Sequence, residues 1–446
     1  MPTLRKGDGA ASRIGGPDRS NFNAGVEFHR RVIAELVWAV LTGLALLGFV
    51  ATAASIAQGM RMAGLVRREM RTSFGAFLPR AVIVLPVRGL DPGFEENLRA
   101  ILSQSYPHFR VLVMADDAGD AAAVRALEIG KATPRIPLAV AVSVPTHLPG
   151  KVNALRSSLA HLAPEDEVVV FADSDIRPAT DWLRQLVQPL ADATVGAATG
   201  FRWYVPPHPT FWSLVRAEWN AVSANVLFDP LRAFAWGGSC AVRQADLSRL
   251  RLEERWRDVL SDDLILTQAV RQAGLRIAYA PAALVPTLEG ATRSACIEWC
   301  LRQMTMATLY HPVVRRYAAA AFAIFDGSVV LGLVCLWLAS IWSPSFVVPA
   351  AVFLAPLPAA PAKAHLRRKA LLSAAPSVAK AWRVPGWKAA AAAIVVPWVM
   401  AWGLMRTRRP AVVKWRGRRY DVTDPLRIRL LESEEPSRPR PIGETG

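Results

Sequence analysis

Hydrophobic residues fall into two kinds of pattern along this chain. Long runs without a charged residue occur near the N-terminus and in the C-terminal third, and short apolar runs alternate with helical patterns between them. Long uncharged runs are typical of membrane-spanning helices, and short apolar runs separated by helices are typical of an α/β domain. We therefore expect membrane helices combined with a water-soluble α/β domain.

The first long run, residues 36–57, is predicted to span a membrane within an anchor at residues 32–60. At about 1.5 Å per residue, a helix over this run crosses the roughly 30 Å hydrocarbon core. A cleaved signal peptide is the alternative, although its apolar region is shorter, about 7–15 residues. An arginine-rich segment follows at residues 61–71, as expected where a span leaves the membrane on the cytosolic side.

The C-terminal third contains two further apolar segments. Residues 318–362 are predicted to form a transmembrane hairpin broken near Pro344, and residues 388–405 a transmembrane helix. If every segment spans, the arginine-rich tail lies opposite the soluble domain, against the preference of basic residues for the cytosol. A re-entrant segment is the alternative, since prolines weaken the second hairpin arm, and both topologies stay open.

Composition and charge narrow the choice of partner. The net charge of +17 favours an anionic partner, and the basic residues cluster beside the apolar runs, which favours a membrane surface over nucleic acid. The four cysteines form no metal-like pair and are expected to be free thiols in a reducing compartment. Residues 1–31 are predicted to be a disordered tail, and residues 406–446 a basic tail with a disordered end.

Residues 80–290 are predicted to form a mostly parallel, Rossmann-like α/β domain, because continuous apolar strands separated by helices indicate a sheet covered on both faces. Ligands bind beyond the carboxyl ends of such strands. Acidic residues occur there after two strands, at 116–117 and 173–175, and a third group at 262–263 opens a helix. Aspartates also cap turns and helix N-termini, which is the structural alternative for each group.

Short motifs accompany these elements. They are PVRGLDP at residues 86–92, NL at 97–98 with YP at 106–107, GKVNAL at 150–155, ADSDIR at 172–177, SANV at 223–226 and GGSC at 237–240. Together they resemble the family-two-like glycosyltransferases of GT-A fold, most closely the ceramide glucosyltransferase group and its bacterial lipid-glycosylating relatives. Near the tail, WRGRRY at residues 415–420 resembles a segment that closes some relatives, and a surface-binding basic patch is its plainer interpretation.

The resemblance implies donor-binding residues. Asp117 would contact the uracil or ribose of a UDP-sugar, and Lys151 would steady the donor. Asp173 and Asp175 would hold the diphosphate through Mg²⁺ or Mn²⁺, which accept carboxylate, phosphate and water oxygens. A solvated lysine at a helix start is the alternative for Lys151.

The resemblance also implies residues on the acceptor side. Asp263 would be the general base of an inverting displacement, and Asp262 stands where the family has Glu. The family's (Q/R)xxRW motif aligns with Trp299, Arg302 and Gln303, so Arg is kept while Trp and Gln have changed places. Arg302 would meet the diphosphate, and Trp299 and Gln303 would lie near the acceptor, with interfacial anchoring the alternative for Trp299.

Residues 291–316 are predicted to form an amphipathic interfacial helix. Trp299, Arg302 and Gln303 would share its substrate-facing side. The opposite stripe, on the membrane or the core, would consist of Ile297, Leu301, Met304 and Thr308.

The implied function is a membrane-bound inverting transfer of sugar from a UDP-sugar, with UDP-glucose the first choice, to a ceramide, diacylglycerol or hopanoid-type hydroxyl. The expected partners are the donor, a lipid acceptor and the bilayer, without nucleic acid. The expected location is the cell inner membrane, multi-pass, with the catalytic domain in the cytosol. A processive polysaccharide synthase and an inactive membrane scaffold are the alternatives.

Overall fold

The computed structural model describes residues 19–71, 77–148, 150–229, 232–382, 384–415 and 417–433. The chain divides into two compact units. The smaller comprises residues up to Ala51 together with Ser328–Pro356, and the larger comprises Thr52–Gly327 and the residues from Leu357 onward.

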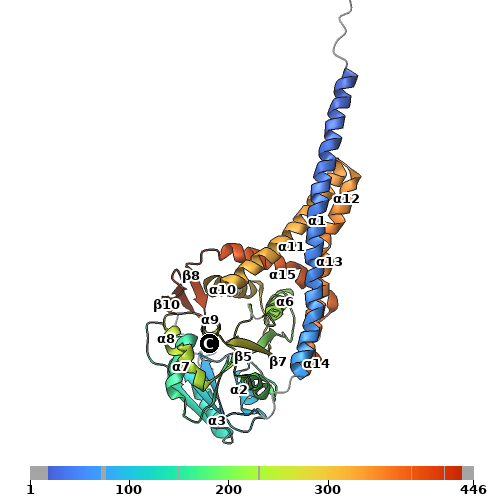
Figure 1. Ribbon diagram of the computed structural model, residues 1–446. Helices are drawn as coiled ribbons and strands as arrows, with labels where there is room; N and C mark the ends of the chain where they lie inside the picture. Colours follow the sequence, from blue (N-terminus) through green and yellow to red (C-terminus); the bar gives the residue numbers. More distant parts are fainter. Residues whose placement is uncertain are drawn as a thin grey trace, which may run out of the picture. The chain divides into compact units, whose positions relative to one another are not determined.

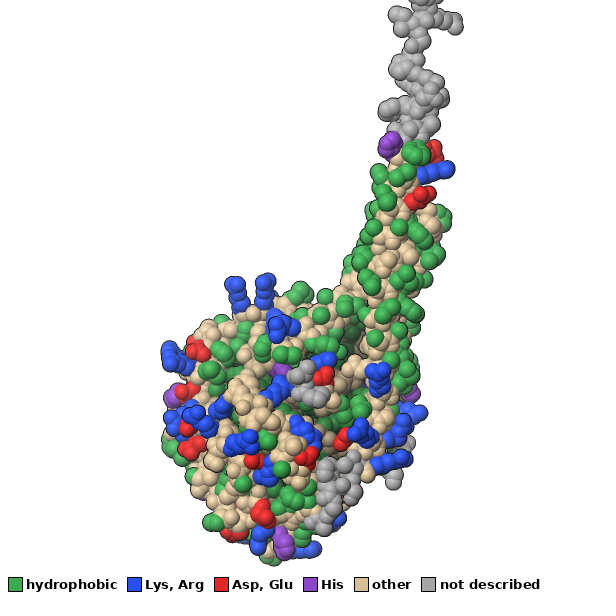
Figure 2. All heavy atoms as spheres, viewed as in Figure 1, with side chains coloured by type: hydrophobic (Ala, Val, Ile, Leu, Met, Phe, Trp, Pro, Cys, Tyr) green, Lys and Arg blue, Asp and Glu red, His purple; other side chains and the backbone are tan. Residues whose placement is uncertain are grey.

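The smaller unit is helical. It contains parts of α1 (Arg19–Arg71) and α11 (Pro312–Ile341) and all of α12 (Val347–Leu354). Ala45, Cys335 and Phe353 are buried where these helices pack. Large apolar side chains cover their outer surface (Figure 2), where Leu47 is 69% exposed and Trp337 59% exposed. Such a surface is favourable in hydrocarbon and costly in water.

Among the described residues, four helices are long and apolar enough to cross a membrane: Glu27–Arg71, Pro312–Ile341, Pro344–Ala374 and Gly386–Arg406. The structure differs from the sequence prediction at both ends of the first helix. Helix α1 begins at Arg19, inside the predicted disordered tail, and continues to Arg71. No proline interrupts this stretch, so the helix can extend beyond its apolar run. The remainder of the predicted tail, residues 1–18, lies outside the described residues.

The larger unit, whose strands β5 and β7 are labelled in Figure 1, is built on a seven-stranded sheet with the order β3-β2-β1-β4-β6-β5-β7. Only β6 runs antiparallel to its neighbours. This arrangement confirms the predicted mostly parallel α/β fold. The strands are β1 (Ala81–Val87), β2 (Phe109–Ala115), β3 (Leu138–Val142), β4 (Val168–Ala172), β5 (Val195–Tyr204), β6 (Ser239–Arg243) and β7 (Arg276–Thr287).

Helices cover both faces of this sheet. One face packs on α2 (Phe94–Leu102), α3 (Ala121–Ala132) and α5 (Trp182–Val187). The opposite face packs on α4 (Lys151–Ser158) and α9 (Asp262–Gln272), with the short helices α7 (Leu247–Leu250) and α8 (Leu252–Arg255) beside them. Alternate side chains of one strand reach opposite cores, as Val111 and Leu112 of β2 do. This two-sided burial explains why the strands are continuous apolar runs.

A second group of helices packs beside β5. It comprises α6 (Phe211–Ser223), α10 (Arg293–Tyr310), α13 (Pro356–Ala374), α14 (Pro376–Ala381) and α15 (Gly386–Arg406). Helix α10 lies between α6 and α15 on one side and α9 and β8 on the other. Met304, predicted on the stripe opposite Trp299, lies in the same buried cluster as Trp299. At Met304 the predicted stripe therefore faces the core, which is one of the two surroundings expected for it.

The C-terminal residues form an ordered sheet rather than a plain basic tail. Its strands are β8 (Val412–Trp415), β9 (Arg418–Asp421) and β10 (Arg429–Ser433), in the order β10-β9-β8. Gly417 has φ of 70° in the turn between β8 and β9, a conformation that favours glycine. Val413 and Tyr420 are buried against Leu148 and Leu260 of the α/β domain. Arg416 and residues 434–446 lie outside the described residues.

Candidate active site

The first part of the site is the junction of β4 and β6. Ala172 at the end of β4 pairs with Ser239 at the start of β6, so Asp173 follows one strand where Gly237 and Gly238 precede the other. A Cβ atom on Gly238 would lie 2.6 Å from Asp173 Oδ2, and one on Gly237 would lie 2.1 Å from Asp262 Oδ2. The paired glycines therefore leave room for two carboxylates.

Lys151 joins these two carboxylates. Its Nζ lies 2.9 Å from Asp173 Oδ1 and 3.2 Å from Asp262 Oδ2. Burial of Lys151 opposes its charge, but the nearby carboxylates of Asp173, Asp262 and Asp263 outweigh this effect and raise its pKa above the ordinary value. Two of the three predicted acidic groups, 173–175 and 262–263, thus meet around one ammonium group.

Arg202 is a second cation in the centre, and sequence reasoning missed it. Its Nη1 lies 3.1 Å from Asp173 Oδ2 and 2.8 Å from Asp175 Oδ1, and its Nη2 donates to the Tyr204 hydroxyl at 2.7 Å. The side chain is 12% exposed. An arginine inside the otherwise apolar strand β5 was the available signal, because a buried charge needs partners.

Asp262 and Asp263 are the first two residues of helix α9, and their side chains have different partners. Asp262 is the partner of Lys151, and burial raises its pKa to about 6, against the opposing effect of Lys151. Asp263 Oδ1 accepts hydrogen bonds from the Leu264 backbone N–H at 2.8 Å and from the Ser261 hydroxyl. Ser261 also caps the helix. The helix start therefore fixes both carboxylates beside the centre.

The two acidic residues after β2, Asp116 and Asp117, have different partners. Asp117, predicted to contact the donor, is exposed, and its Oδ1 accepts a hydrogen bond from the Gly119 backbone N–H at 2.8 Å. Asp116 lies 2.9 Å from Arg418 Nη2 of β9. The C-terminal sheet therefore reaches this end of the site.

Trp299, Arg302 and Gln303 do not share one environment. The Trp299 ring is buried against Tyr204 and Trp219, with centroid distances of 5.5 Å and 4.7 Å. Arg302 lies over the Trp415 ring at 5.3 Å, and Gln303 is half-buried. Trp299 thus supports the centre indirectly, since the Tyr204 hydroxyl accepts the hydrogen bond from Arg202.

The model of glycosyl transferase family 21 matches residues 40–428, which covers the α/β domain and most of the flanking helices. The chain belongs to glycosyl transferase family 21. This family includes ceramide glucosyltransferases, and the mostly parallel sheet is typical of GT-A glycosyltransferases. Among curated proteins, none matches this chain.

Two solved structures illustrate the similarity of this family 21 chain to known proteins. A mannosyltransferase from Pyrobaculum calidifontis in complex with GDP-Man and Mn²⁺ has 22% identity and a TM-score of 0.41, covering 81% of this chain and 99% of that one. A glucosyl-3-phosphoglycerate synthase from Mycobacterium tuberculosis in complex with phosphoglyceric acid has 18% identity and a TM-score of 0.33, covering 50% of this chain and 77% of that one.

The centre of this family 21 chain suits a divalent cation of the Mg²⁺ type. The described residues contain no group of three or more His, Cys, Asp or Glu side chains that could hold a metal. However, Asp173 Oδ2 and Asp175 Oδ1 converge on one positively charged nitrogen, Arg202 Nη1. Two carboxylate oxygens aimed at one point match the ligands of Mg²⁺, which keeps water and takes substrate phosphate for the remainder.

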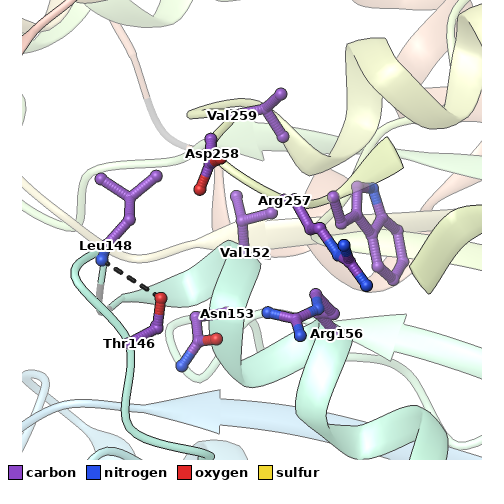
Figure 3. A pocket seen from close by; sticks show the side chains of 9 residues that line it. Thr146, Leu148, Val152, Asn153, Arg156, Arg257, Asp258 and Val259 are labelled. Atoms are coloured by element: carbon purple, nitrogen blue, oxygen red, sulfur yellow. Dashed lines mark hydrogen bonds between the residues drawn. The ribbon is translucent and has the colours of Figure 1, made fainter. Parts of the chain in front are cut away.

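A small pocket lies beside the centre of the family 21 domain, between α4 and the loop that precedes α9 (Figure 3). Arg156 and Asn153 line it from α4, and Arg257 and Asp258 line it from the loop. None of the predicted site residues lines this pocket.

Proposed function

We propose that this family 21 chain is a membrane-bound inverting glycosyltransferase that moves a sugar from a UDP-sugar to a lipid hydroxyl. UDP-glucose is the first donor to test, and ceramide, diacylglycerol and hopanoid-type alcohols are the acceptor classes. We place it in the cell inner membrane with the catalytic domain in the cytosol, since basic residues such as Arg67 and Arg68 follow the first candidate span.

One observation carries the proposal: carboxylates far apart in sequence meet around Lys151. Asp173 and Asp262 contact its ammonium group directly, and Asp263 is near enough to affect its pKa. A structural ion pair needs only one carboxylate, whereas this centre gathers three at the carboxyl edge of the sheet, where ligands of such folds bind.

The chemistry divides among these residues. The acceptor oxygen attacks the anomeric carbon as the bond from that carbon to the β-phosphate oxygen breaks, and the bonding electron pair leaves with UDP. Asp263 takes the hydroxyl proton. Lys151 and Arg302 offset the charge that grows on the diphosphate. Asp173 and Asp175 would hold Mg²⁺ or Mn²⁺, which supplies further charge neutralisation when bound.

A lipid acceptor is supported by the surroundings of α10. This helix carries Arg302 and packs against the candidate span α15, where a Cβ atom on Gly403 would lie 3.1 Å from Met304 Cγ. A hydroxyl at the surface of a bilayer that contains α15 could therefore reach the site without leaving the membrane.

The test is product analysis with the purified full-length protein. Several UDP-sugars are incubated with Mn²⁺ and a total lipid extract, and the products are separated and weighed by mass spectrometry. We expect one lipid species heavier by a single hexose and release of UDP only when lipid is present. A ladder of polymer masses would instead indicate a polysaccharide synthase, and no transfer from any donor would indicate a scaffold.

A further inference from the structure

The C-terminal sheet β8–β10 contacts the loops that carry the site motifs. Tyr420 and Val413 are buried with Leu148, just before Lys151, and with Leu260, just before Ser261. The Ile428 backbone N–H donates to the Asp258 carbonyl at 2.8 Å. Figure 1 shows this sheet next to α10, which contacts β8. A detached basic tail would make no such contacts.

Helix α10 is tied to the same sheet. The Tyr310 hydroxyl donates to the Pro425 carbonyl at 2.8 Å and accepts from the Leu260 backbone N–H at 3.1 Å. Earlier in the same helix, Arg302 lies over the Trp415 ring of β8 at 5.3 Å. The sheet therefore links the helix that carries Arg302 to the loop that precedes α9.

Arg418 of this sheet approaches two of the donor motifs. Its side chain is 9% exposed and pairs with Asp116 at 2.9 Å. Its Nη1 would lie 3.1 Å from a Cβ atom on Gly150, the residue before Lys151. Arg418 thus lies between the end of β2, where the donor base is proposed to bind, and Lys151, where its diphosphate is proposed to bind.

The hydrogen bonds of Arg418 are incomplete. Its Nε–H is buried, and no hydrogen-bond partner for it is present in the part of the chain that the structure describes. A guanidinium has five N–H donors and matches phosphate oxygens in a bidentate manner. The Asp116 carboxylate and the Tyr420 hydroxyl use only part of this capacity. Burying an arginine without full pairing costs free energy, which a bound anion would recover.

We propose that the sheet β8–β10 is one wall of the donor site and that Arg418 binds the diphosphate of the nucleotide-sugar. The inference rests on the proposed function, because it assumes a nucleoside diphosphate donor. In the donor-free protein Asp116 holds the guanidinium in place, and on binding the diphosphate oxygens become additional acceptors.

The decisive experiment titrates UDP into the full-length protein in detergent with Mn²⁺ present, and calorimetry measures the heat of binding. The variants are Arg418→Ala and, as matched control, Arg419→Ala. Arg419 is the next residue of β9, is 47% exposed and pairs with Glu432 at 2.9 Å within the small sheet. We expect Arg418→Ala to weaken UDP binding by about tenfold or more, and Arg419→Ala to change it less than about twofold.

The same titration with uridine separates direct contact from a structural role. If Arg418 touches the diphosphate, its removal weakens UDP binding more than uridine binding. Equal losses for both ligands, or unchanged UDP binding, would overturn the inference. Absence of UDP binding by the wild-type protein would instead overturn the proposed function itself.

A second variant covers the case in which Arg418→Ala does not fold. Asp116→Asn keeps the guanidinium and removes its competing carboxylate. We expect UDP binding to stay equal or become tighter, because a negative charge near the diphosphate is lost. If Arg418 only fastens the sheet to Asp116, this variant weakens UDP binding, which contradicts the inference.

Discussion

The acidic centre around Lys151 and the contact between Asp116 and Arg418 are both built from carboxylates and cations, but in different proportions. At the centre, Asp173, Asp175 and Asp262 share two cations, Lys151 and Arg202. At the other end, the Asp116 carboxylate pairs with the Arg418 guanidinium. Surplus negative charge suits a metal and a proton acceptor, whereas a buried arginine suits an anion.

This difference teaches how the two regions contribute. The centre is expected to govern the chemical step, so changes there should act on kcat. The C-terminal contact is expected to govern donor binding, so changes there should act on affinity. Variants that alter kcat without altering donor affinity, or the reverse, would support this division of roles. Variants that alter both equally would contradict it.

The largest effect is expected for Asp263→Asn. Removal of the general base should lower kcat by about 10²–10⁴-fold, while UDP binding stays nearly unchanged because the metal and diphosphate ligands remain. Initial rates and UDP titration measure the two quantities. Asp262→Asn is the matched control on the same helix start and should retain more transfer. Full activity of Asp263→Asn would show that Asp263 is not the general base.

A backbone change at the centre should rank second. In Gly238→Ala the new Cβ atom would lie 2.6 Å from Asp173 Oδ2, so the carboxylate must move away from Lys151 and Arg202. Displacement of this size is expected to cost about 10²-fold in kcat. Gly290→Ala is the control, since its Cβ atom meets only Ser213 Oγ at 3.8 Å. Equal activities of the two variants would show that the Asp173 position is not required.

Tyr204→Phe should give a smaller effect. It removes the hydroxyl that accepts the 2.7 Å hydrogen bond from Arg202 Nη2, which loosens the cation that orients Asp173 and Asp175. We expect about a tenfold loss of activity. Tyr106→Phe is a suitable control because it also removes a buried hydroxyl, one that donates to the Pro79 carbonyl at 2.6 Å. A similar loss in both would indicate a general loss of stability.

The smallest effect concerns pH. Burial raises the pKa of Asp262 from 3.8 to about 6. The folded state therefore holds this proton more tightly than the unfolded state, so its contribution to stability is present below about pH 4 and is lost as pH rises through about 6. The Tm of the wild type relative to Asp262→Asn should fall as pH rises from about 4 to about 6, the window that those pKa values set. A difference in Tm that does not change with pH would show that Asp262 stays charged over this pH range.

The sequence by itself determined the elements and the acidic candidates. Continuous apolar runs marked the strands, and the acidic residues after β2 and β4 followed from where those runs ended. The first helix was harder to delimit, because residues 19–31 carry no apolar periodicity and the extension of a helix beyond its apolar run depends on the neighbouring residues. Its start at Arg19 was therefore missed.

Only the tertiary structure decided which charges meet. Arg202 lies on β5 and reaches Asp173 because β6 inserts between β4 and β5 and brings their ends together. Arg418 reaches Asp116 across most of the chain because Val413 and Tyr420 bury their side chains on the loop near Leu148. Sequence spacing reports local periodicity, whereas ion pairs between distant segments depend on strand order and on which apolar surfaces are buried together.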